Sequence, residues 1–158
     1  MSVKTVQSNQ KTKMSSAAWL RWASFGLAGL GLLVSLYLTW IKVANTSAFC
    51  GGVGDCESVN ASRYSEVGGV PIAAMGAAAY AAILILLAVE PRSEFWRQWS
   101  PVAVFGLGLA GTLYSAYLTY IEVAVLRAVC PYCVVSAIAV TSVFVISVVR
   151  LWRSNSES

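Results

Sequence analysis

Four long apolar stretches dominate this chain and restrict it to a membrane-spanning fold. They cover residues 17–41, 70–89, 101–126 and 131–152, and each reaches or exceeds the ~20 residues that a helix needs to cross ~30 Å of hydrocarbon. Charged residues make up 11% of the chain, whereas soluble domains carry about 25%. The sequence therefore predicts an all-α integral membrane protein, with a four-transmembrane-helix bundle over residues 17–153.

Polar segments flank this bundle at residues 1–16 and 154–158, and we expect both to be flexible. The basic leader and first apolar stretch are typical of a signal peptide, but the apolar run is longer than the ~7–15 residues of such a peptide. Trp19, Trp22 and Trp40 mark its two ends as interfacial. We therefore expect a retained first helix.

Lysine and arginine residues are unevenly divided between the two ends of the predicted helices. With four helices, both termini and the second loop share one side, which carries eight of the 11 Lys and Arg residues. These are Lys4, Lys11, Lys13, Arg21, Arg92, Arg97, Arg150 and Arg153. Because positively charged flanks remain cytoplasmic, we expect cytoplasmic termini and a long extracytoplasmic loop at about residues 42–69, between helices one and two. These flanks explain the net charge of +4 without a nucleic-acid partner.

The four cysteines form two pairs, both on the predicted extracytoplasmic side, where disulfides persist. Cys130 and Cys133 form a C-x-x-C motif at the start of the fourth stretch, and Cys50 and Cys56 lie in the long loop. A C-x-x-C pair is typical of a dithiol that opens and closes in catalysis. Pro131 at the first helical position leaves both sulfurs close to helix N–H groups that stabilise a thiolate. Electrons passing from an aqueous thiol to a lipid-soluble acceptor would account for this arrangement.

An internal repeat relates the first and third stretches at an offset of 80 residues. Segments 35–44 and 115–124 carry the same residue at most positions, and each leads to a cysteine, Cys50 or Cys130, in the same register. This favours a duplicated two-helix unit with parallel halves. Glu122 has no evident partner in the sequence, and near the outer interface we expect it to be hydrated, with a functional role as the less favoured alternative.

Glycines recur in the two repeated stretches. Small residues let membrane helices approach closely, so we interpret these glycines as packing residues. They are Gly26, Gly29, Gly31, Gly106, Gly108 and Gly111.

Taken together, the cysteine motifs resemble those of the vitamin K epoxide reductase family, in its bacterial branch. The resemblance rests on Cys50-x5-Cys56, Ser62 six residues further, a Gly-Val-Pro entry to the second helix, and Cys130-Pro-Tyr-Cys133 at the start of the fourth. It implies four helices around a quinone of the ubiquinone, menaquinone or plastoquinone type, with the loop folded over the outer end. It also implies that Cys130 and Cys133 are the active-site pair, that Cys50 and Cys56 shuttle electrons to it, and that Ser62 positions the loop or the active site.

The chain departs from the family pattern at two positions. Vertebrate members bind vitamin K with an Asn at the start of helix two and a Tyr one turn past the C-x-x-C, and the matching residues in this chain are Ile72 and Ala137. This favours simple quinone reduction over epoxide reduction. Many bacterial members also carry a fused thioredoxin-like domain, so we expect the thiol donor to be a separate protein unless this sequence is one domain of a longer chain.

We expect the quinone ring to lie beside Cys133, the deeper cysteine of its pair. Ligand pockets in helical bundles form between facing helices. Small and apolar residues of helices two and four, within a turn or two of the outer face, should therefore wall the ring. These are Ile72, Met75, Gly76 and Ala137.

The predicted function is that of a membrane thiol:quinone oxidoreductase that generates disulfides, in the cytoplasmic membrane of a bacterium. A thioredoxin-like extracytoplasmic protein would donate electrons through a mixed disulfide at Cys50. Cys56 would then attack Cys130, and Cys133, released as a thiolate, would reduce the quinone. The chain has no histidine, which thiol–disulfide exchange does not require.

Three alternatives remain for the cysteines. They could form structural disulfides that staple a non-enzymatic membrane transporter or scaffold. The four sulfurs also suit a zinc site, although an oxidising compartment disfavours one, so we expect no metal. The DsbB type of quinone-linked enzyme carries its C-x-x-C in the first outer loop, which is the opposite order to this chain.

Overall fold

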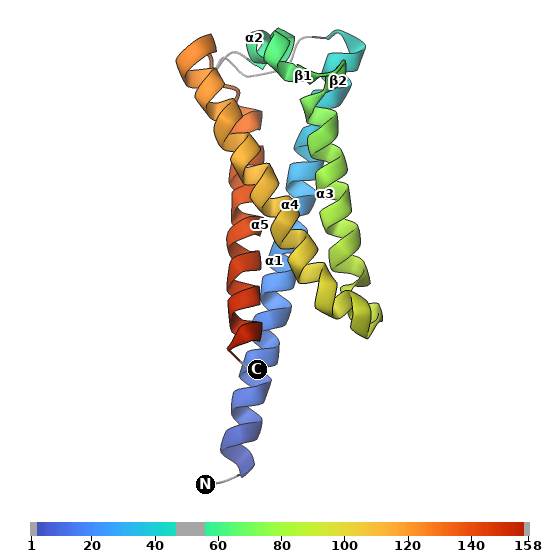
Figure 1. Cartoon of the computed structure of the whole chain (residues 1–158), viewed down its shortest axis with the longest axis vertical. Coiled ribbons are helices and arrows are strands. Elements are labelled where there is room, and N and C mark those ends of the chain that lie inside the picture. The colour runs from blue at the N-terminus through green and yellow to red at the C-terminus, as the bar shows by residue number, and fades with distance from the viewer. Residues whose placement is uncertain (1–2, 47–55, 157–158) are drawn as a thin grey trace.

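The computed structural model describes residues 3–46 and 56–156, with side chains described over 18–46, 58–59, 61–154 and 156. Four long helices make up most of it: α1 (Val3–Ala44), α3 (Ile72–Val89), α4 (Glu94–Tyr120) and α5 (Pro131–Asn155). Both chain ends lie toward one end of the bundle, and the short elements of the first loop lie at the other (Figure 1).

Each long helix contributes a segment that is long and apolar enough to cross a membrane. The segments are Ala18–Ala44, Ile72–Arg92, Glu94–Leu126 and Pro131–Ser154. Many of their large apolar side chains face outward, as a lipid environment allows; Leu33, Ile85 and Leu113 are each more than 60% exposed. The prediction of an all-α, four-helix integral membrane bundle is confirmed.

The ends of the bundle are helical beyond the predicted limits. α1 begins at Val3, so most of the 1–16 segment continues the first helix, and α5 ends at Asn155. The expected flexibility of residues 1–16 and 154–158 stays a prediction.

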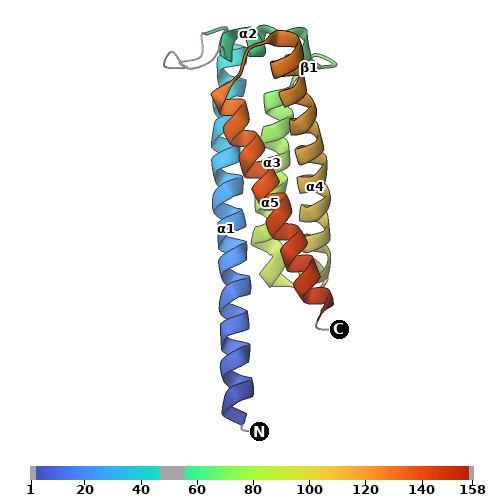
Figure 2. The ribbon, with the colours of Figure 1, turned by 90° about the vertical axis from the view of Figure 1, so that its left-hand side faces the viewer.

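The four helices contact one another in a closed ring, in which α1 and α4 each pack against both α3 and α5. Figure 2 shows α5 between α1 and α4, with α3 behind them. The buried core between the helices contains Ala28, Tyr80, Ile83, Leu87, Val104, Val140 and Val143.

Small residues at equivalent positions of the 80-residue repeat bring the helices together. Ala28 and Gly108 are equivalent, and both are buried. Gly31 and Gly111 are also equivalent, and a Cβ atom added to Gly31 would lie 2.2 Å from the Tyr80 ring. Both halves of the repeat therefore use a small side chain at the same two positions of the helix surface.

The packing role predicted for the glycines is confirmed for only part of the set. A Cβ atom at Gly108 would lie 3.1 Å from the Phe144 backbone, and one at Gly111 would lie 2.6 Å from Val140. For the other three glycines the prediction is wrong, because a Cβ atom added to any of them would meet no other side chain or helix within 4 Å. These are Gly26, Gly29 and Gly106.

The first loop folds into a cap over one end of the bundle, which we call the cap end. The cap comprises α2 (Cys56–Ala61), the 3-10 turn η1 (Arg63–Ser65), and a hairpin of β1 (Glu66–Val67) and β2 (Val70–Pro71). The hairpin turns through Gly68 and Gly69, whose φ angles of 60° and 83° suit glycine in a two-residue turn. The cap therefore ends directly at the start of α3.

Lys42, in the last turn of α1, anchors the cap to the bundle. Its Nζ donates to Ser65 Oγ at 2.7 Å and lies 3.2 Å from Glu66 Oε1. The two contacts join α1 to η1 and to the hairpin at once, which holds the cap in register with the helix.

At the opposite end of the bundle, the turn η2 (Glu90–Arg92) joins α3 to α4. Glu90 is buried there, and its carboxylate pairs with Arg150 of α5. A buried carboxylate is costly unless it is paired, so this ion pair accounts for the burial of Glu90.

We predict that Gly31→Ala destabilises the protein, whereas Gly26→Ala does not. The new methyl group at residue 31 would overlap the Tyr80 ring, and overpacking of this kind costs about 1–3 kcal/mol. Residue 26 has open space around it and is the matched control on the same helix. Thermal unfolding of both variants in detergent measures the difference; equal midpoints would contradict the packing assignment.

Candidate active site

A cavity of about 60 Å³ lies at the cap end, between the cap and the helix ends beneath it. By the measure in which one water needs ~10–15 Å³, it has room for about four to six waters. Most of its wall is apolar. It is lined by Leu38, Val59, Ser62, Tyr64, Ser65, Ile72, Leu118, Ile121, Glu122, Leu126, Cys130 and Cys133.

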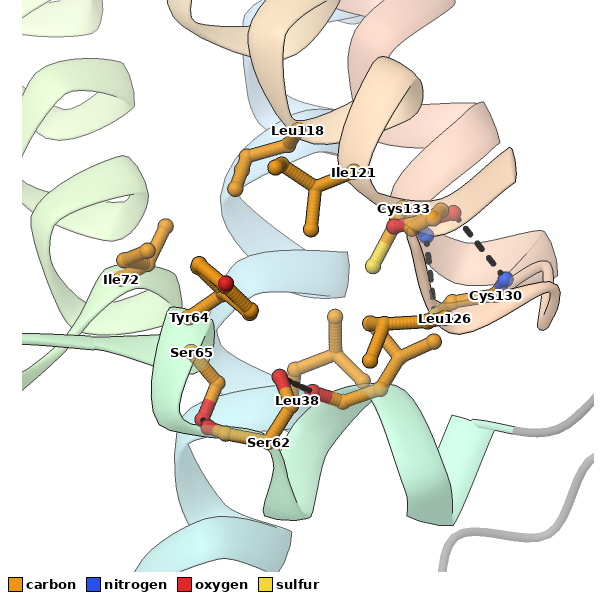
Figure 3. A pocket seen from close by; sticks show the side chains of 12 residues that line it. Leu38, Ser62, Tyr64, Ser65, Ile72, Leu118, Ile121, Leu126, Cys130 and Cys133 are labelled. Atoms are coloured by element: carbon orange, nitrogen blue, oxygen red, sulfur yellow. Dashed lines mark hydrogen bonds between the residues drawn. The ribbon is translucent and has the colours of Figure 1, made fainter. Parts of the chain in front are cut away.

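The walls of the cavity come from every major element of the fold. Ile72 and Tyr64 lie on the side opposite Cys130 and Cys133 (Figure 3). Leu38 and Leu118, which occupy equivalent positions of the 80-residue repeat, line it from α1 and α4. The duplicated helices therefore contribute the same side chain to the same cavity.

Cys130 and Cys133 sit in one wall of this cavity as two free thiols. Cys130 is the N-cap of α5, and Pro131 occupies the first helical position, as the sequence predicts. The backbone N–H of Cys133 donates to Cys130 Sγ at 3.3 Å. The Cys130 side chain is only 1% exposed, whereas Cys133 is partly exposed toward the cavity.

The surroundings of Cys130 favour its thiolate. The thiol of Cys133 donates to the Cys130 sulfur and, together with the Cys133 backbone N–H, holds the pKa of the Cys130 thiol below its ordinary value. Burial and the nearby Glu122 carboxyl oppose this shift without reversing it. Cys130 is therefore the member of the pair that ionises first.

Glu122 lies against this pair, and the expectation that it is hydrated is wrong. Its side chain is only 5% exposed, and its Oε2 accepts a hydrogen bond from the Cys130 backbone N–H at 3.3 Å. The Glu122 carboxyl also contacts the Cys133 side chain. The sequence pattern thus failed to predict that Glu122 is buried beside the cysteine pair.

The burial of Glu122 follows from an irregular end of the third span. After α4 the chain forms a π-helical segment, η3 (Ile121–Leu126), which Arg127 ends in the left-handed conformation with φ of 51°. The N–H groups of Arg127 and Ala128 both bond to the Glu122 carbonyl, which turns the chain back toward Cys130. Single π-helical turns of this kind are frequent at functional sites.

Ser62 lines the cavity from the cap. Its Oγ donates to the Val59 carbonyl at 2.7 Å, and its own carbonyl accepts from both the N–H and the Oγ of Ser65. These bonds hold the turn between α2 and η1. The positioning role implied for Ser62 by the family resemblance stays a proposal.

The residues predicted to wall a quinone are divided by the structure. Ile72 and Cys133 line the cavity. Met75, Gly76 and Ala137 are not among its lining residues: Met75 is 47% exposed, and a Cβ at Gly76 would face Ser35 of α1 at 3.3 Å. The cap reaches only the first turn of α3, so the remainder of α3 packs on α1 below the cavity.

The loop cysteines are only partly within the described structure. Cys50 lies outside the described residues, and Cys56 is described only as the first backbone residue of α2. Their contacts with Cys130, and hence the predicted order of the relay, stay predictions.

Fold and site together define an integral membrane protein with a C-x-x-C dithiol in a largely apolar cavity at the end of its bundle. Residues 22–148 match the model of the Vitamin K epoxide reductase family, and the chain belongs to this family. A relative, the Thiol-disulfide oxidoreductase LTO1 of Arabidopsis thaliana, is 37% identical over 123 residues. The match covers 74% of this chain but 33% of LTO1, so the chain spans about a third of that relative's length.

We predict that Cys133→Ala raises the pKa of Cys130. The variant keeps the backbone N–H but removes the thiol that donates to Cys130 Sγ, so the thiolate loses its strongest stabilising contact. The measurement is a pH titration of ultraviolet thiolate absorbance in the reduced protein, with Cys50→Ala and Cys56→Ala as background. With Cys133 present, the first titration should lie below that of an ordinary thiol; an unchanged midpoint in Cys133→Ala would exclude the contact as the cause.

Proposed function

We propose that this chain is a membrane thiol:quinone oxidoreductase that generates disulfides in a partner protein. The observation that carries the proposal is the dithiol of Cys130 and Cys133 in the wall of an apolar cavity, under a cap that begins at Cys56. Membership of the family and the similarity to LTO1, a thiol-disulfide oxidoreductase, support it. The partner would be a thioredoxin-like dithiol protein on the extracytoplasmic side of a bacterial cytoplasmic membrane.

The residues of the cavity fit a quinone ring as substrate. Leu38, Ile72 and Leu118 offer apolar contact from three helices, and the Tyr64 hydroxyl offers a hydrogen-bond donor at the rim. Nothing in this donor set is specific for an epoxide, which agrees with the replacement of the vertebrate Asn and Tyr by Ile72 and Ala137.

Electron transfer would proceed by two thiol–disulfide exchanges and one reduction. A partner thiolate attacks the Cys50–Cys56 disulfide, and its second thiol then resolves the mixed disulfide. Cys56 next attacks Cys130, which releases Cys133 as a thiolate in the cavity wall. Completion of this exchange leaves Cys130 and Cys133 reduced, and re-forming their S–S bond passes two electrons to the quinone.

The depressed pKa of Cys130 has a role in this sequence. A thiol with a lowered pKa is the better leaving group and the better populated thiolate at neutral pH. Cys130 itself therefore needs no separate general base to become a thiolate. The absence of histidine from the chain does not prevent this ionisation of Cys130.

We predict that single serine substitutions trap two different intermediates of the relay. Cys56→Ser should accumulate a mixed disulfide between Cys50 and the partner, because the resolving sulfur is missing. Cys133→Ser should accumulate a Cys56–Cys130 cross-link for the same reason. Mass spectrometry of trapped species identifies the bonds, and recovery of the partner on Cys133 would overturn the proposed order.

We predict that Ile72→Trp slows quinone reduction at least tenfold, whereas Ile85→Trp leaves it unchanged. Both residues are on α3, but Ile72 lines the cavity and Ile85 is 62% exposed on the lipid face. The measurement is a single-turnover reduction of a short-chain ubiquinone analogue by the pre-reduced protein. Equal rates in the two variants would place the quinone elsewhere, and no reduction by the unmodified protein would overturn the proposed function.

A further inference from the structure

Glu122 is the one carboxylate among the residues that line the described cavity. The other titratable groups that face it are Tyr64 of the cap and the two thiols of α5; α1 and α3 contribute only Leu38 and Ile72. The relay described above makes no use of Glu122. A chain without histidine nevertheless needs some group to handle the protons of this reaction.

Glu122 differs from the other buried glutamate of the bundle. Glu90 is paired with Arg150, whereas none of the ion pairs among the described residues includes Glu122. Lys42 occupies the position equivalent to Glu122 in the 80-residue repeat, but its Nζ bonds to Ser65 and Glu66 in the cap. A buried carboxyl without a cation is costly, and within a membrane span such a residue points to function.

The contacts of Glu122 lie on both members of the cysteine pair. Oε2 accepts from the Cys130 backbone N–H at 3.3 Å, and the carboxyl touches the Cys133 side chain. A candidate base must lie beside the proton that it removes, and Glu122 and Cys133 line the same cavity and interact through their side chains. Cys133 is also the sulfur that is exposed toward the cavity.

Building on the proposed function, we propose that Glu122 is the proton acceptor for the Cys133 thiol when the cysteine pair reduces its quinone substrate. In this step the Cys130–Cys133 S–S bond forms, the two S–H bonds are lost, and the sulfurs give up two electrons. The substrate takes up these two electrons and two protons as it becomes a quinol. Glu122 takes the Cys133 proton, returns it to the substrate and is left as a carboxylate; the second proton is that of Cys130, or one from water where Cys130 is already ionised.

The competing explanation is that Glu122 only caps the N–H of Cys130. Glu122→Gln separates the two roles, because the amide oxygen still accepts from that N–H but the side chain no longer accepts a proton. Glu122→Asp keeps a carboxylate, but its side chain is one methylene shorter, so the carboxylate lies farther from the cysteine pair. Glu94→Gln is the matched control, since Glu94 is an exposed glutamate in α4, paired with Arg97 and remote from the cavity.

The first measurement is single-turnover reduction of a short-chain ubiquinone analogue by the reduced full chain, as a function of pH. Glu122→Gln should be slower by about 10²-fold, the lower end of what general acid–base groups contribute. Glu122→Asp should lie between it and the unmodified protein, and Glu94→Gln should match the unmodified protein. The unmodified rate should fall at low pH as Glu122 and the Cys130 thiolate become protonated, and Glu122→Gln should lose the part of this dependence that belongs to Glu122.

The second measurement needs no quinone. Infrared difference spectra between the dithiol and disulfide forms should contain a carboxyl band, because the Cys133 thiol is the partner that appears and disappears beside Glu122. The band should be absent in Glu122→Gln and present in Glu94→Gln. Thermal unfolding of Glu122→Gln in detergent should match the unmodified protein.

Three outcomes would overturn the inference. If Glu122→Gln has the same rate and pH profile as the unmodified protein, Glu122 serves only to accept the hydrogen bond from the Cys130 N–H. A slow Glu122→Gln variant with a lowered unfolding midpoint, or a difference spectrum without a Glu122 band, would indicate a structural role. Failure of the unmodified protein to reduce the quinone would overturn the proposed function together with this inference, whereas turnover that is insensitive to Glu122→Gln overturns this inference alone.

Discussion

Hydrocarbon offers the backbone no hydrogen-bond partners, and this constraint organises the whole molecule. The four spans satisfy their N–H and C=O groups internally as helices, so irregular backbone is confined to the ends of the bundle. The π-helical turn η3, the left-handed Arg127 and the two-stranded hairpin all lie at the cap end. The cavity with Cys130 and Cys133 lies there too, between the cap and the helix ends.

The 80-residue repeat places equivalent residues of α1 and α4 at the site, but some of these equivalent residues have different chemical roles. Leu38 and Leu118 line the cavity from equivalent positions of α1 and α4. Four residues further along each helix, the equivalents diverge into Lys42, which anchors the cap, and Glu122, which contacts the cysteine pair. One half of the duplication thus holds the cover of the cavity, and the other half holds its reactive groups.

The sequence predicts those parts of the structure that depend on local composition and spacing. The spans follow from the length of apolar runs, and the placement of Cys130 at the N-cap of α5 follows from Pro131. The hairpin escaped prediction because strands of two residues show no periodicity. The burial of Glu122 escaped prediction because it depends on a π-helical turn, which no periodicity in the sequence indicates.

The cavity wall was harder to predict, because depth along a helix is a poor guide to which side faces a neighbour. Met75 and Ala137 lie at a suitable height but do not reach the cavity, whereas Tyr64 of the cap does. No hydrophobic periodicity in the sequence indicates that Tyr64 lies beside residues of α4 and α5. Contacts between a folded loop and a distant helix depend on tertiary structure, which a pattern in a single sequence does not contain.

The bond between the Cys133 N–H and Cys130 Sγ couples the start of α5 to the oxidation state of the pair. A thiolate at the N-cap accepts from the helix N–H groups more strongly than a neutral disulfide sulfur does. The N-terminus of α5 therefore stabilises the reduced form of the pair, and a dithiol whose reduced form is stabilised is a stronger oxidant. In the proposed relay this favours electron flow into Cys130 and Cys133 from the loop cysteines, and it requires an acceptor beyond them of higher potential, which is the thermodynamic reason why a membrane quinone suits the last step.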